Sequence, residues 1–187
     1  MNFDDQYILP AVRSMKEFDK MLETSYTCGV FLDVHVGMLK SIFAYARQQE
    51  RKMFLHADLI QGLKNDEYAA EYLAQEIKPY GIISTKGSTI QKARQKDVFA
   101  IQRAFIIDSS ALERSVQLVK KTNPDFIEIL PGVVPKVISQ MKERTGKPII
   151  AGGLIDSKEE VEAAIKAGAT AVSTSNQSLW KVFDQRD

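Results

Sequence analysis

Two neighbouring apolar runs end in residue types that suit a bound anion. Gly152 and Gly153 follow one run, and Ser173, Thr174 and Ser175 close the next. Glycine lets backbone N–H groups approach an anion closely, and hydroxyl groups donate further hydrogen bonds. The helix expected after the second run places the positive end of its dipole at the same point. We therefore predict that these two loops hold a phosphate group; the alternative is that they serve only as turns.

Charged and imidazole side chains mark the ends of the other apolar runs. In chain order they are Arg13, Asp33, His35, His56, Asp58, Lys86, Arg103 and Glu128. A buried charge is unfavourable unless it is paired, so packing alone does not explain so many charges at such positions. Glu128 lies inside an apolar run, and we expect Arg103 or Lys86 to be its partner. His56 and Asp58 alternate along one run, so both can face inward.

The elements that position these residues alternate regularly. Eight short apolar runs read as strands, at 7–11, 29–34, 52–58, 81–85, 98–103, 125–130, 148–152 and 171–175. Helical patterns occupy 13–23, 36–50, 66–78, 88–96, 109–121, 134–145, 157–167 and 176–183. Near-continuous apolar strands that alternate with helices favour a parallel sheet covered on both faces.

Eight such repeats predict an α/β fold, a compact (β/α)₈ TIM-like barrel, as one domain over residues 1–187. The carboxyl ends of the strands then meet at one rim, where barrels place their binding sites. The competing fold is an open doubly wound sheet. No run is followed by the G-x-G-x-x-G pattern, which weighs against that alternative.

Composition is that of an ordinary globular protein. The 187 residues are 44% hydrophobic and 26% charged, with a formal net charge of +1, so no global field attracts a polyanion. Cys28 is the only cysteine, which excludes an internal disulfide. The N-terminus lacks the pattern of a signal peptide, and no apolar run is long enough to span a membrane. We expect a cytoplasmic protein with no membrane partner.

Six segments together resemble a known family. They are residues 55–63 (LHADLIQGL), 81–86 (GIISTK), 100–109 (AIQRAFIIDS), 125–132 (DFIEILPG), 149–155 (IIAGGLI) and 171–176 (AVSTSN). Over most of its length the chain is similar to the glycerol-3-phosphate-responsive transcription antiterminators, the regulators of glycerol uptake operons. The resemblance implies a barrel that senses glycerol 3-phosphate and then acts on leader mRNA, rather than an enzyme.

The resemblance also implies roles for individual residues. Gly152, Gly153, Thr174 and Ser175 would hold the phosphate. His56, Asp58, Lys86, Arg103 and Glu128 would surround the glycerol end. No catalytic residue, metal or other cofactor is implied; His, Asp and Glu side chains could hold a divalent ion, but no close ligand spacing is present.

An RNA partner would need a local basic surface. Lys92, Arg94 and Lys96 lie in one helical segment, where Lys92 and Lys96 share a face. We predict this patch as the RNA-binding surface; a solvated helix face explains it equally well. A second cluster comprises Lys136, Lys142, Arg144 and Lys147. Because no RNA-recognition motif is present, RNA binding rests on the resemblance. Assembly into a homo-oligomer is left open.

A second class of function remains open from the residues themselves. A barrel enzyme acting on a small phosphorylated substrate, of isomerase, aldolase or phosphodiesterase type, would use the same rim. Lys86 could then form a Schiff base, and Glu128 or His56 could act as a general acid or base.

Overall fold

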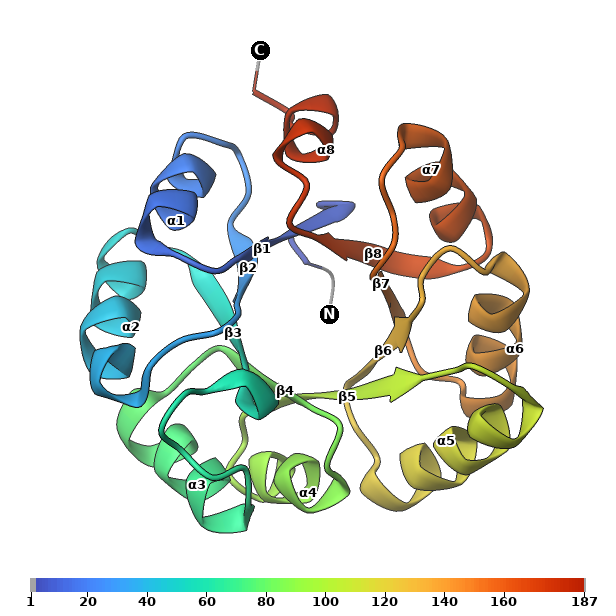
Figure 1. Ribbon diagram of the computed structural model, residues 1–187, viewed down its shortest axis with the longest axis horizontal. Coiled ribbons are helices and arrows are strands. Elements are labelled where there is room, and N and C mark those ends of the chain that lie inside the picture. The colour runs from blue at the N-terminus through green and yellow to red at the C-terminus, as the bar shows by residue number, and fades with distance from the viewer. Residues whose placement is uncertain (1–2, 187) are drawn as a thin grey trace.

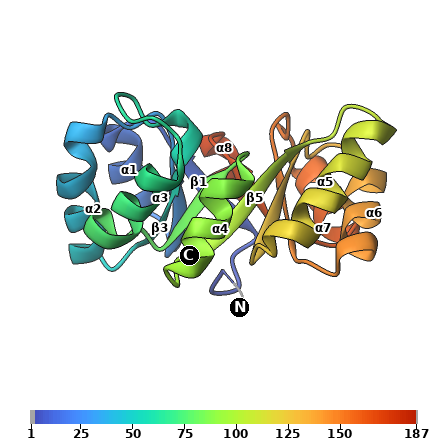
Figure 2. The same ribbon diagram turned by 90° about the horizontal axis from the view of Figure 1, so that it is seen from below.

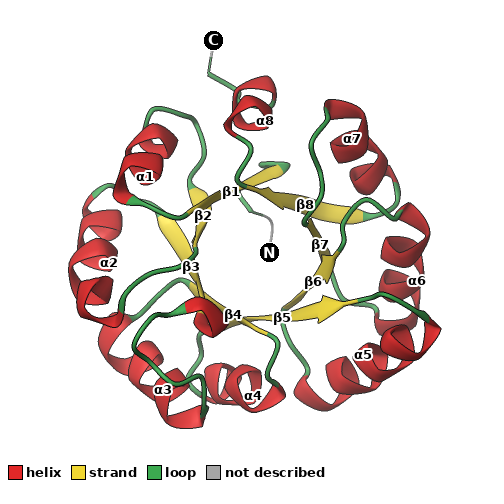
Figure 3. Cartoon of the chain, in the orientation of Figure 1, coloured by secondary structure: helices red, strands yellow, loops and turns green. Residues whose placement is uncertain are grey.

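In the computed structural model, which describes residues 3–186, eight parallel strands close into a barrel (Figures 1 and 3). Neighbours in the barrel are neighbours in sequence, and β8 pairs with β1. The strands are β1 (Ile8–Val12), β2 (Cys28–Phe31), β3 (Lys52–His56), β4 (Gly81–Ser84), β5 (Phe99–Phe105), β6 (Phe126–Leu130), β7 (Ile149–Gly152) and β8 (Ala169–Thr174). The predicted (β/α)₈ barrel is confirmed, and the open sheet is excluded.

Helices form an outer ring around the strands, as the side view of Figure 2 also shows. They are α1 (Met15–Leu22), α2 (Leu39–Gln48), α3 (Glu67–Tyr72), α4 (Gly87–Gln95), α5 (Ser109–Thr122), α6 (Pro135–Thr145), α7 (Lys158–Lys166) and α8 (Gln177–Val182). Two 3₁₀ turns, η1 (Val36–Met38) and η2 (Ala57–Leu59), follow β2 and β3, and a π-helical turn, η3 (Leu73–Ile77), extends α3. None of the described helices could cross a membrane.

Local signals explain where several helices begin and end. The Ser157 hydroxyl accepts a hydrogen bond from the N–H of Glu160, whose side chain accepts from the N–H of Ser157, so the expected capping box opens α7. Gly168 follows this helix with φ of 105°, a conformation that favours glycine. The Asp66 side chain caps α3 by accepting from the N–H of Ala69. Short-range chemistry therefore sets the loop lengths that place the strand ends.

Two apolar layers hold the barrel. One fills its interior and the other lies between strands and helices. At the amino-terminal end, the buried Phe3 ring packs against Phe126 and Phe54, with centroid distances of 4.6 and 5.8 Å. Phe3 thus fills the lower end of the barrel interior, and polar side chains are left to occupy the opposite end.

Three carboxyl-terminal strand ends differ from the sequence-based prediction by two or more residues. β3 ends at His56 and turns into η2, so the prediction that Asp58 alternates with His56 along one strand was wrong. β2 ends at Phe31, which leaves Asp33 (φ 48°) and His35 in the following loop. β5 extends to Phe105, two residues beyond Arg103. These shifts decide which predicted side chains point into the mouth of the barrel.

Candidate ligand-binding site at the mouth of the barrel

A cavity of about 390 Å³ opens at the carboxyl ends of the strands. We call it the mouth cavity. Its walls come from β1, β2, η2, β5, β6, β8 and the loops after β7 and β8. The lining residues are Ala11, Arg13, Val30, Leu32, Leu59, Arg103, Glu128, Leu130, Gly153, Leu154, Ile155, Asp156, Ser173, Thr174, Ser175 and Asn176. The cavity therefore combines an apolar floor with charged and hydroxyl groups contributed by distant segments.

A buried ion pair lies in this cavity. The register of β5 and β6 places Arg103 directly beside Glu128, and Arg103 Nε donates to Glu128 Oε2 at 2.6 Å. The Ser173 hydroxyl donates to the other carboxylate oxygen, Oε1, also at 2.6 Å. The Glu128 side chain is only 2% exposed and that of Arg103 15% exposed. The expectation that Glu128 needs a cationic partner is confirmed, and the partner is Arg103 rather than Lys86.

His56 lies buried at the end of β3, beside this ion pair, and does not itself line the mouth cavity. Neither ring nitrogen has a hydrogen-bond partner among the described residues, although the residue is only 2% exposed. Burial, reinforced by the nearby Arg103 guanidinium, lowers the His56 pKa from 6.5 to about 4. The imidazole is therefore neutral at pH 7, with one donor and one acceptor to offer. An unsatisfied buried polar group of this kind is rare in a folded protein and calls for a partner, such as a water molecule or a ligand group.

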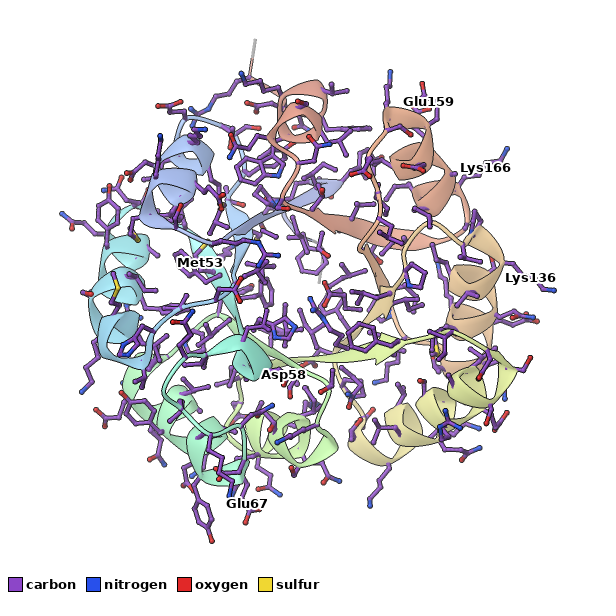
Figure 4. All side chains as sticks on the ribbon, in the orientation of Figure 1. Met53, Asp58, Glu67, Lys136, Glu159 and Lys166 are labelled. Carbon is purple, nitrogen blue, oxygen red and sulfur yellow. The ribbon has the colours of Figure 1, made fainter. Side chains whose placement is uncertain are left out.

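Asp58 and Lys86 belong to a different network. The Asp58 carboxylate accepts from the Ser84 hydroxyl at 2.5 Å and the Thr85 N–H at 2.8 Å, and also from the Asn65 side chain. Lys86 is exposed, and its Nζ donates to the Asn65 carbonyl at 2.6 Å. Neither residue lines the mouth cavity, and Figure 4 shows Asp58 on η2 at the inner edge of the ring. Both residues hold the loops after β3 and β4 together.

The two glycines after β7 have different surroundings. Gly153, with φ of 73°, lines the mouth cavity. Gly152 is buried and does not line it; a Cβ atom there would lie 2.7 Å from Ser173 Oγ and 3.0 Å from Glu128 Oε1. Glycine at 152 therefore makes room for the hydrogen bond between Ser173 and Glu128. Its predicted contact with a phosphate stays a prediction, and the structure gives this glycine a spatial role.

The hydroxyl loop after β8 forms the opposite wall. Thr174 and Ser175 both line the mouth cavity, and their predicted contact with a phosphate stays a prediction. Thr174 Oγ1 accepts from the Asn176 N–H at 3.1 Å, and Asn176 caps α8 by accepting from the Ser178 N–H at 3.0 Å. These bonds fix the loop, so that Gly153 and Ser175 line one cavity with Arg103.

The remaining rim residues are Arg13, Asp33 and His35, of which only Arg13 lines the mouth cavity. Arg13 lines the mouth cavity and forms an ion pair with Asp33. Asp33 and His35 lie outside it, and His35 Nδ1 accepts from the Gly37 N–H at 3.1 Å. No group of three or more His, Cys, Asp or Glu side chains in residues 3–186 is arranged to hold a metal ion.

The predicted RNA patch on α4 is engaged in ion pairs. Lys96 and Lys92 both approach the Glu71 carboxylate, with N–O distances of 2.5 and 3.8 Å, and Arg94 pairs with Asp125. In the second cluster, Arg144 pairs with Glu113 at 2.5 Å. Within residues 3–186, acidic side chains therefore pair with all three α4 cations but, in the second cluster, only with Arg144.

Some residues of the site were missed or undervalued in the sequence. Asn65 is the hub of the loops after β3 and β4, and its Oδ1 also accepts from the Thr89 hydroxyl at 2.8 Å. Leu59, Ile155 and Asp156 line the mouth cavity without a chemical signature in the sequence. Ser173 was noted only as a hydroxyl near the phosphate loop, whereas in the structure it donates to Glu128.

Comparison with known proteins identifies close relatives. Residues 8–180 match the profile of a family described as glycerol-3-phosphate responsive antiterminator. The glycerol uptake operon antiterminator regulatory protein of Listeria monocytogenes is 48% identical and covers 97% of this chain and 98% of its own, with a TM-score of 0.94. A glycerol uptake operon antiterminator-related protein of Thermotoga maritima is 28% identical over 94% of this chain and 98% of its own, with a TM-score of 0.84.

Two further matches extend the comparison. The Escherichia coli protein YgcP is 42% identical over 146 residues, which are 78% of this chain and 76% of that protein. The deoxyribose phosphate aldolase of Aeropyrum pernix is 16% identical, covering 96% of this chain and 90% of its own, with a TM-score of 0.70. At that identity the likeness shows the barrel fold alone.

Proposed function

The chain belongs to the glycerol-3-phosphate responsive antiterminator family, and on that premise we propose that its mouth cavity binds glycerol 3-phosphate and that the bound form acts on leader mRNA. The proposed outcome is transcription that continues past a terminator in glycerol-utilisation genes. The observation that carries the ligand site is the Arg103–Glu128–Ser173 hydrogen-bonded set, together with the unpartnered His56 ring beside it. Acting on nascent mRNA would place the protein in the cytoplasm.

The geometry suits a ligand with one anionic and one polyol end. Gly153, Thr174 and Ser175 offer N–H and hydroxyl donors at one side of the cavity, where a phosphate would be held. Glu128 offers carboxylate oxygens, and the neutral His56 ring offers one donor and one acceptor, which match alcohol groups. A carboxylate in place of the glycerol hydroxyls would face Glu128 and be repelled. The site therefore favours a phosphorylated alcohol over a phosphorylated acid.

Regulation requires that the ligand distinguish two states of the protein. A ligand shifts an equilibrium only as far as it binds one state more tightly than the other. The Arg13 guanidinium, paired with Asp33 at the cavity edge, could turn toward a dianionic phosphate and release the loop after β2. Such a change would convert ligand binding into a rearrangement of the rim.

A leader-RNA binding assay tests this proposal. The protein is titrated into labelled leader RNA from a glycerol-utilisation operon, with and without glycerol 3-phosphate, and with glycerol or inorganic phosphate as control ligands. We expect glycerol 3-phosphate alone to raise the affinity by at least about fivefold, the lower range of allosteric coupling. Equal RNA affinity under all conditions would contradict a ligand-responsive regulator.

The placement of the lysine residues bears on the enzyme alternative. No lysine lines the mouth cavity among the described residues, and Lys86 Nζ is bonded to the Asn65 carbonyl. A Schiff-base nucleophile would have to leave that bond and reach in from outside. Incubation with glycerol 3-phosphate distinguishes the two functions: a sensor is stabilised thermally and returns the ligand intact, whereas an enzyme forms product.

A further inference from the structure

The barrel has a second cavity at its other end. It has a volume of about 510 Å³ and lies where α2 leads into β3, η3 into β4, and α4 into β5. We call it the basal cavity. It is lined by Phe43, Ala46, Arg47, Glu50, Arg51, Lys52, Met53, Lys78, Pro79, Tyr80, Asp97, Val98 and Phe99. The proposed glycerol 3-phosphate site uses none of these residues.

The lining carries more positive than negative charge. Its cations are Arg47, Arg51, Lys52 and Lys78, and its acids are Glu50 and Asp97. Within residues 3–186, Lys52 pairs with Asp4 at 2.7 Å, while Arg51 and Lys78 form no ion pair. Arg51 Nε is buried without a hydrogen-bond partner. The Arg51 guanidinium and the Lys78 ammonium group at this cavity are therefore available to an anion.

An aromatic wall stands beside these cations. The rings of Tyr80 and Phe99 lie 5.2 Å apart, both partly exposed, and Lys52 Nζ lies 5.7 Å from the Tyr80 ring centre. Flat aromatic surfaces next to cations are what single-stranded nucleic acids require, since bases stack on rings while phosphates contact Lys and Arg. Helix α4 itself contains no aromatic residue, and its cations are already paired with Glu71 and Asp125.

We propose that the basal cavity is the RNA-binding surface, and that it takes a single-stranded segment of the leader RNA. One base lies against the Tyr80–Phe99 wall, and the flanking phosphates contact Arg51 and Lys78. This inference rests on the proposed function, from which the RNA partner comes. The strands β3 and β5 run from this cavity to the mouth, since Lys52 and Phe99 begin the strands on which His56 and Arg103 stand.

The test removes the two available charges without disturbing the backbone. Arg51→Gln keeps a polar side chain of similar length, and Lys78→Asn suits the left-handed conformation of that residue (φ 54°), which asparagine tolerates well. The matched control is K166Q/K181Q, which removes the same charge from exposed lysines of α7 and α8; Figure 4 shows Lys166 on the outer side of the ring. Leader RNA is titrated at several salt concentrations with glycerol 3-phosphate present.

We expect R51Q/K78N to bind leader RNA about tenfold more weakly, with the slope of log affinity against log salt reduced by about 1.4, or about 0.7 for each lost phosphate contact on a single strand. The K166Q/K181Q control should retain wild-type affinity. The variant Phe99→Leu removes the aromatic ring without changing charge, so it should weaken binding and leave the salt slope unchanged. Thermal stabilisation by glycerol 3-phosphate should persist in every variant, which shows that each is folded.

The outcomes separate the inference from its premise. Wild-type affinity and salt slope in R51Q/K78N would overturn the basal cavity as the RNA surface. If that double variant does not fold, wild-type affinity in F99L would overturn it. Loss of binding in K92A/R94A/K96A with R51Q/K78N unaffected would move that surface to α4. If wild-type protein binds leader RNA neither with nor without ligand, the proposed function itself fails, and this inference falls with it.

Discussion

Replacing Arg103 by methionine tests the energetics of the mouth cavity most sharply. Methionine preserves much of the apolar stem of arginine but leaves the Glu128 carboxylate, 2% exposed, without its cation. Removing one partner of a buried ion pair typically costs about 3–5 kcal/mol, because the remaining charge stays desolvated. Arg103 is 15% exposed and Ser173 still donates to Glu128, so we place the loss at the lower end, about 3 kcal/mol.

Urea denaturation of four proteins measures this cost. They are the wild type, Arg103→Met, Glu128→Gln and the double variant R103M/E128Q. The double variant should recover at least about 1 kcal/mol relative to R103M, because a neutral amide no longer needs the cation. The reasoning is refuted if R103M unfolds within about 0.5 kcal/mol of wild type, the usual range of surface substitutions. It is equally refuted if the double variant is no more stable than R103M.

Three further outcomes follow from the same contacts. Because the His56 pKa is lowered to about 4, the unfolded chain binds a proton between about pH 6.5 and 4 that the folded chain does not. The free energy of unfolding should therefore fall by about 1.4 kcal/mol per pH unit as pH drops from about 6.5 toward 4. Urea denaturation of His56→Gln across that range should show that this part of the slope is lost. In Gly152→Ala the new methyl group would crowd Ser173 Oγ and Glu128 Oε1. Calorimetry should show weaker glycerol 3-phosphate binding together with a stability loss of about 1–3 kcal/mol. Unchanged binding would exclude the spatial role of this glycine. Ser157→Ala breaks the α7 capping box and should lower the free energy of unfolding by about 1 kcal/mol. Calorimetry should show unchanged ligand affinity in this variant, and a loss of affinity would contradict the role of α7 as scaffold.

Local patterns predicted the barrel well. The strands and helices follow from apolar runs and capping residues such as Ser157 and Asp66, whose effects extend over one turn of helix. The pairing of Arg103 with Glu128 was foreseen only as one of two choices. Strand register decided between them, because β5 and β6 place these two residues side by side. The cost of burying a charge requires a partner for Glu128 but does not determine which residue that partner is.

Other features depend on contacts that no local pattern encodes. Asp58 leaves the strand because β3 turns into η2, and its carboxylate then bonds to Ser84 and Thr85 from the next repeat. The α4 cations find Glu71 and Asp125, which come from the preceding and following repeats. A run of basic residues in a sequence says nothing of acids brought beside it by folding. The basal cavity was missed for the same reason, since its lining spans residues 43–99.

Nuclear magnetic resonance of the histidine rings tests the central claim most directly. The chain has two histidines, His56 at the end of β3 and His35 in the loop after β2, so their ring signals report separately on the buried ion pair and on the rim loop. Titration with glycerol 3-phosphate should shift the His56 ring nitrogens saturably, while glycerol or phosphate alone should have little effect. Ring signals of His56 that stay fixed while the ligand is bound would contradict the site described here.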